Sequence, residues 1–120
     1  MDTRAKIVSG PSCASSLEQL RRTSPSLRVV SGYFDPVLAS HAQRLEAERA
    51  GAEALAVIVL EPPEPILPSR ARAELVAALA AVSLVLVPEG AAMPAVDASF
   101  EAQDLADRAR FTAHVRERQS

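Results

Sequence analysis

The sequence predicts an α/β fold of Rossmann-like type, with a parallel sheet and helices on both of its faces. Three short apolar segments, residues 27–31, 55–60 and 83–87, alternate with segments whose apolar residues recur every three to four positions. Strands and helices that alternate in this way form repeated βαβ units. Because such crossovers are right-handed, the strands run parallel and the helices cover the sheet.

A short helix is expected before the first strand. Ser15 is followed three residues later by Glu18, which is the spacing of a capping box, and two leucines give the segment an apolar side. The turn signal Thr-Ser-Pro-Ser at residues 23–26 ends this helix. Residues 27–31 are short, partly β-branched and stop at Gly32, which predicts a buried strand.

The next elements follow from periodicity and from proline. An amphipathic helix is expected from Leu38 to Gly51, where apolar side chains recur every three to four positions. Residues 55–60 are apolar without interruption, as in a strand that is covered on both faces. The four prolines of residues 61–68 exclude regular structure, so this segment is a loop. Ser69 can then cap the helix that precedes the third strand.

Residues 1–87 are therefore expected to form the α/β core, and residues 88–120 a linker followed by a C-terminal helix. This helix can begin at Asp97 or Ser99 and reach about Arg118. Its apolar side is patchy, so it is expected to pack on the core or on a partner. A chain of 120 residues fits a single domain.

Composition excludes several classes of protein. An apolar fraction of 48% and a net charge of -2 argue against a disordered segment and against a nucleic-acid binder that relies on basic charge. The longest apolar run, residues 75–87, is shorter than the roughly 20 residues that cross a bilayer, and residues 1–6 lack a signal sequence. We expect a cytoplasmic protein without membrane contact, in which the single Cys13 is a small apolar residue.

The loop after the first strand has the composition of a phosphate-binding site. Residues 32–41 read Gly-Tyr-Phe-Asp-Pro-Val-Leu-Ala-Ser-His. In open parallel sheets, ligands bind beyond the carboxyl ends of the strands, where a helix N-terminus offers unpaired amides to an anion. This segment resembles the G-x-F-D-x-x-H-x-G-H signature of the nucleotidylyltransferase superfamily. Four positions match it: Gly32, Phe34, Asp35 and His41.

The resemblance extends over roughly residues 6–87 and is closest to heptose-phosphate adenylyltransferases and glycerol-phosphate cytidylyltransferases. In those proteins an arginine-bearing helix precedes the next strand, and Arg72 matches the family arginine. By resemblance His41 is the catalytic residue, and Arg70 is a further phosphate contact. The resemblance also implies a set of nucleotide-binding residues: Gly32, Tyr33, Phe34, Asp35, Ser40 and Arg72.

The implied reaction is transfer of AMP or CMP from ATP or CTP, with Mg²⁺ on its phosphates, to a small phosphorylated sugar or polyol. The chain is expected to supply no metal site of its own. Leu38 stands where the first motif histidine belongs and Ser40 where the glycine belongs. Loss of one such donor typically costs about 10²- to 10³-fold in rate. No I-S-S-T-x-x-R segment, which grips the triphosphate in the family, follows Val87, so the activity is expected to be impaired.

Each motif residue also has a structural interpretation. A histidine near the start of a helix, such as His41, is usually solvated surface, and Asp35 before a proline can start a turn. Phe34 fits the core better than a ligand contact. Arg70 and Arg72 lie in the first turn of a helix, where cations are unfavourable unless an anion compensates, and solvated side chains are the alternative.

Two further functions remain open at this point. The chain can be a catalytically inactive nucleotide-binding or dimerisation module of the same fold. It can also be a purely structural domain, in which the terminal helix at 99–118 completes a homodimer. The second alternative has a physical motive, because a sheet edge exposed at the third strand invites pairing or covering.

Overall fold

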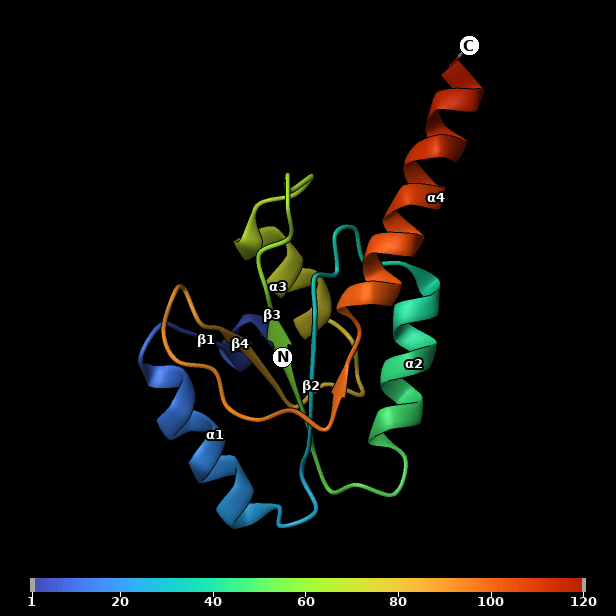
Figure 1. The fold of residues 1–120 in the computed structure, drawn as a ribbon. Coiled ribbons are helices and arrows are strands. Elements are labelled where there is room, and N and C mark those ends of the chain that lie inside the picture. Colours follow the sequence, from blue (N-terminus) through green and yellow to red (C-terminus); the bar gives the residue numbers. More distant parts are fainter. Residues whose placement is uncertain (1, 120) are drawn as a thin grey trace.

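The computed structural model describes residues 2–119 and confirms the predicted fold class (Figure 1). Within these residues, five parallel strands form one sheet in the order β1-β4-β3-β2-β5. Its three inner strands are β4 (Leu84–Val87), β3 (Leu55–Val59) and β2 (Arg28–Gly32). These strands coincide within a residue or two with the three predicted apolar segments, because a parallel sheet covered by helices on both faces buries both sides of such segments.

Two strands that the sequence analysis does not place form the edges of the sheet. β1 (Ile7–Ser9) pairs with β4, and β5 (Ala98–Ser99) pairs with β2. The expected free edge at the third predicted strand is therefore wrong, since β1 covers β4. Strands of three and two residues are too short to show a hydrophobic period, which is why the sequence does not reveal them.

The helices lie on both faces of the sheet, as predicted. α1 (Ser12–Thr23) packs on one face, whereas α2 (Ala39–Arg49) and α3 (Ser69–Ala77) pack on the other. A short 3₁₀ helix, η1 (Thr3–Lys6), precedes β1. α1 begins before the expected capping box, and the Ser15 hydroxyl donates to a carbonyl inside the helix instead of capping its start.

Alternate residues of each inner strand point to opposite faces and divide the core into two layers. Val30, Val57 and Val85 lie in the layer shared with α2 and α3. The other layer includes Leu86 and, from α1, Cys13, whose pKa burial raises. Cys13 is thus the small apolar residue that composition predicts.

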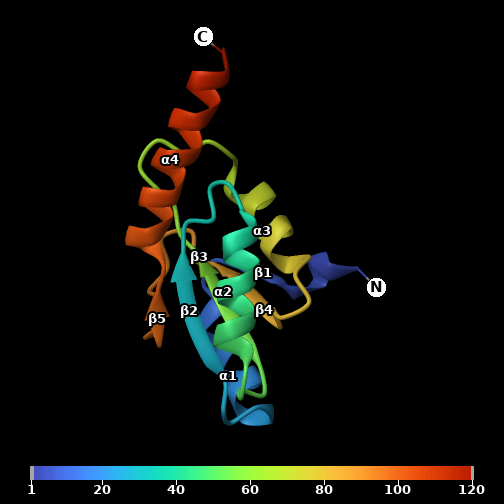
Figure 2. The same ribbon diagram turned by 90° about the vertical axis from the view of Figure 1, so that its right-hand side faces the viewer.

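α4 (Glu101–Gln119) follows β5 directly and runs away from the sheet, beyond the carboxyl ends of the strands (Figure 1, Figure 2). It begins later than the expected Asp97 or Ser99, because Ala98 and Ser99 are paired with β2. The loops that follow β2 and β3 lie at the same end of the sheet as the start of α4. Of the helices within the described residues, none has the length and apolar character to cross a membrane.

Candidate functional site

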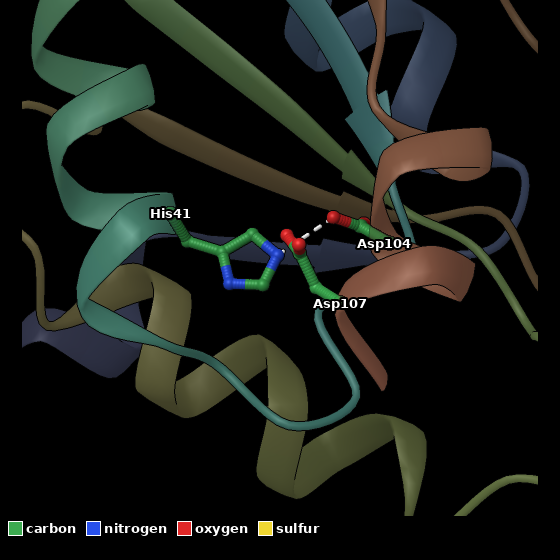
Figure 3. Close-up of side chains that lie close together, drawn as sticks. All are labelled: His41, Asp104 and Asp107. Carbon is green, nitrogen blue, oxygen red and sulfur yellow. Dashed lines mark hydrogen bonds and ion pairs between the residues drawn. The ribbon is translucent and has the colours of Figure 1, made fainter. Parts of the chain in front are cut away.

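Two backbone amides of the β2–α2 loop and the ring of His41 in the first turn of α2 converge on one carboxylate, that of Asp104 in the first turn of α4. Figure 3 shows the His41 ring directed at this carboxylate. The Tyr33 N–H donates to Oδ2 at 2.7 Å and the Phe34 N–H donates to the same oxygen at 3.2 Å. Nε2 of His41 lies 2.6 Å from Oδ1. His41 and Asp104 are only 1% and 4% exposed. In the loop that the sequence predicts to bind an anion, these donors are therefore taken by a side chain of α4.

The second ring nitrogen of His41 determines how the ring is protonated. The backbone N–H of Leu38 donates to Nδ1 at 2.8 Å, so Nδ1 carries a lone pair and the ring proton lies on Nε2. His41 is thus a hydrogen-bond donor toward Asp104. It is also the third residue of α2, where its side chain satisfies an amide that the helix leaves unpaired. The alternative of a solvated His41 is wrong, since the ring is buried among protein groups.

Gly32 and Phe34 shape the space around the Asp104 carboxylate. A Cβ atom at Gly32 would lie 2.7 Å from Oδ2 of Asp104 and 2.8 Å from Cε2 of Phe34, closer than atoms normally pack. Phe34 has a φ of +51° and is fully buried, with its ring centroid 5.0 Å from that of His41. The Phe34 side chain thus belongs to the core, as expected, while its backbone amide is one of the donors to Asp104.

Arginines neutralise the acidic side of the site. Arg44 donates to Oδ2 of Asp107 at 2.7 Å and lies 4.0 Å from Oδ1 of Asp104, with its guanidinium over the Phe100 ring. Arg110 also bonds Asp107. Burial alone raises the pKa of the Asp107 carboxyl, but the hydrogen bond from Gln103 and the two arginine charges outweigh burial and hold this pKa below its ordinary value.

Asp35 and Arg72 tie together the loops that follow β2 and β3. Asp35 accepts hydrogen bonds from the Ile66 and Leu67 amides at 2.7 and 2.8 Å. The Arg72 side chain is fully buried and donates to three carbonyl oxygens and one carboxylate, which belong to Tyr33, Leu60, Leu67 and Glu61. The alternative of a solvated Arg72 is therefore wrong. Four of its five N–H groups are engaged by the protein, so Arg72 acts in this structure as a clamp between loops.

The other predicted contacts lie outside this cluster. Ser40 is exposed in the first turn of α2. Arg70 lies on the outer side of α3, where its side chain is 58% exposed and forms an ion pair with Glu74 one turn later. The structure thus brings Gly32, Tyr33, Phe34 and His41 together around Asp104. It places Asp35 and Arg72 in the adjoining loop contacts.

The cluster of His41, Asp104 and Asp107 also has three metal-ligand atoms within 4.8 Å of one another. A histidine that binds a metal through Nε2 normally donates its Nδ1–H to an acceptor. Here Nδ1 accepts from the Leu38 amide, so the ring has the wrong tautomer for a metal ligand. Arg44 and Arg110 already hold Asp107. These residues do not fit a metal ion in this arrangement.

Sequence reasoning does not identify Asp104, Asp107 or Arg44 as site residues. Glu101, Asp104 and Asp107 recur at intervals of three, which places them near one face of a helix and is a signal that the sequence contains. Acidic residues in a first helical turn are explained equally well by the helix dipole, so the signal does not point to His41.

Chemically, the arrangement can hold an oxyanion through two backbone amides and one imidazole N–H. No family model matches the sequence, and no curated protein matches it. The function proposed below therefore rests on this geometry and on the resemblance of the motif loop.

Proposed function

We propose that this chain is a catalytically inactive nucleotide-binding module of nucleotidylyltransferase-like fold, whose β2–α2 loop holds a phosphate group of a nucleotide such as ATP or CTP. The observation that supports it is the convergence of the Tyr33 amide, the Phe34 amide and His41 Nε2 on one carboxylate. A phosphate oxygen accepts the same hydrogen bonds as a carboxylate oxygen. The nearby Arg44 adds positive charge.

The chain lacks much of what nucleotidyl transfer requires. Transfer depends on donors that stabilise charge on the phosphoryl oxygens as it develops. At the position of the first motif histidine, Leu38 has an aliphatic side chain that cannot donate a hydrogen bond. Arg72 already donates to carbonyl oxygens of the chain itself. Any Mg²⁺ would arrive with the nucleotide phosphates, since the buried cluster does not suit a metal. Binding without turnover is what these residues support best.

Two measurements on the same protein test this proposal. Pyrophosphate release is followed with ATP or CTP, Mg²⁺ and a panel of phosphorylated sugars and polyols, and none is expected above background. Isothermal titration calorimetry with ATP, CTP, AMP and CMP should show saturable binding to at least one nucleotide. Steady pyrophosphate release would instead establish an active transferase. Absence of binding to every nucleotide, by the wild type and by Asp104→Asn alike, would overturn the proposal.

A homodimer formed through α4 is a second candidate. Leu105, Phe111 and Val115 of this helix are 36–41% exposed, so large apolar side chains of α4 are accessible to a second copy of the chain. Sedimentation velocity at micromolar concentrations, with Phe111→Ser as the comparison, tests this candidate. A monomer across the whole concentration range would exclude it.

A further inference from the structure

We infer that α4 is an internal inhibitor of the phosphate site, because its Asp104 carboxylate takes the hydrogen bonds that a phosphate would need. A phosphate ligand then binds only when the start of α4 leaves the loop. This inference rests on the proposed function, since it assumes that the loop holds a phosphate group. It goes beyond that function by assigning to the C-terminal helix control over access to the site.

Occupancy by Asp104 and by a phosphate is mutually exclusive. The amides of Tyr33 and Phe34 have one proton each, and both already point at Oδ2. The proton on His41 Nε2 points at Oδ1. On the side of Gly32 the carboxylate is closely packed, since a Cβ added there would lie 2.7 Å from Oδ2. Two anions would also repel each other in a buried site.

The start of α4 is held mainly by polar contacts, which water or a ligand can replace. Phe100 is its buried apolar anchor, and the preceding strand β5 has two residues. The other contacts with the core are polar. They are the bond from the Phe100 N–H to the Ser31 carbonyl, the side-chain bonds of Glu101 and Asp107, and the contacts of Arg108 with Pro63 and Asp35. Oε2 of Glu101 is buried without a hydrogen-bond partner among the described residues, which lowers the stability of the docked state. Elements attached in this way open at lower free energy than the core.

Release of α4 would also prepare the site for an anion. Arg44 loses its bond to Asp107, whose oxygen lies 2.7 Å from Nη2 when α4 is docked. The Arg44 side chain is 28% exposed and lies 4.0 Å from the present carboxylate position, so it can turn toward a bound phosphate. After release, the Arg44 guanidinium is no longer paired with Asp107, so the open site has a free cation that the closed site lacks. This positive charge favours the binding of phosphate to the open site.

The test compares affinity for inorganic phosphate and for AMP in the full chain and in Asp104→Asn, measured by calorimetry. Asparagine keeps the shape of the side chain but removes the competing charge, and we expect binding to be about tenfold tighter or more. Glu18→Gln is the matched control, because it removes one negative charge from an exposed position on α1. This variant should bind as the wild type does.

Hydrogen–deuterium exchange on the wild type provides a second readout that does not depend on the folding of any variant. Saturating phosphate or AMP should accelerate exchange in residues 101–110 and leave β3 and β4 protected. Equal affinity of wild type and Asp104→Asn, with no change in α4 exchange, would overturn the inference while leaving the proposed function intact. Absence of binding by both proteins would instead remove the proposed function.

Discussion

The imidazole of His41 lies 2.6 Å from the carboxylate of Asp104, a residue 63 positions later in the chain. The hydrogen bond joins the first turn of α2 to the first turn of α4, and both side chains are buried. A loop that resembles a nucleotide site is therefore also a contact that holds the C-terminal helix on the core. The bonds around this contact and in the adjoining loops lead to four predictions.

The two side chains should be energetically coupled. We expect Asp104→Ala to lower the free energy of unfolding by about 2–4 kcal/mol, because it leaves buried donors without an acceptor. His41→Ala leaves the buried carboxylate with one donor fewer. The double variant should cost less than the sum of the two by about 1 kcal/mol or more. Urea denaturation of the four proteins measures this difference, and strictly additive losses would show that the contact is energetically unimportant.

Gly32→Ala should be destabilising although it adds one methyl group. Its Cβ would approach Oδ2 of Asp104 to 2.7 Å and the Phe34 ring to 2.8 Å, so one of them must shift. Such overpacking typically costs about 1–3 kcal/mol. Thermal unfolding of Gly32→Ala is compared in the wild-type and Asp104→Ala backgrounds. The loss of stability caused by Gly32→Ala should be smaller in the Asp104→Ala background, where Oδ2 of Asp104 is absent. An equal loss in both backgrounds would show that the added methyl group does not clash with Asp104.

Arg72 and Arg70 differ by two positions, but only mutation of Arg72 should destabilise the protein strongly. Arg72→Ala removes hydrogen bonds from three partly buried carbonyl oxygens, and each unpaired buried group costs about 1–3 kcal/mol. Arg72→Lys should recover little, because an ammonium cannot reproduce the planar fork. Arg70→Ala is the control, since its exposed ion pair contributes about 0–1 kcal/mol. Similar melting temperatures for Arg72→Ala and Arg70→Ala would contradict the clamp role.

Asp107 should contribute a pH-dependent part of the stability. Its pKa is lower in the folded protein than its ordinary value of 3.8, because Gln103, Arg44 and Arg110 favour the charged form over the effect of burial. A lowered pKa gives stability that is present above the ordinary value and is lost as pH falls through the folded pKa. The stability gap between wild type and Asp107→Asn should therefore be full at pH 6–7 and shrink below about pH 4.

Urea midpoints between pH 3 and pH 7 measure that gap. Glu18→Gln, which removes an exposed carboxylate, is the control. A gap that stayed constant with pH, or that grew as pH fell, would show that the folded carboxyl is not stabilised in its charged form.

The sequence by itself determined the three inner strands, the helices between them and the class of fold. Each inner strand is an apolar run bounded by turn residues, and each of those helices has apolar residues at helical spacing, so the local pattern is sufficient. The buried position of Phe34 could likewise be inferred from its type. The motif at residues 32–41 indicated where an anion would bind, and the loop there does present its donors to a carboxylate.

Only the tertiary structure decided which anion lies in that loop. The partner of His41 lies on a helix whose acidic residues have an equally good local explanation, so no pattern joins the two. Arg72 was similar, since a first-turn arginine is normally solvated, and its burial depends on a bond to the carbonyl oxygen of Tyr33, 39 positions earlier in the chain. Edge strands of two or three residues also arise from pairing with a sheet already formed. The physical reason is common to all three: these contacts join segments far apart in the chain, and local periodicity has no information about them.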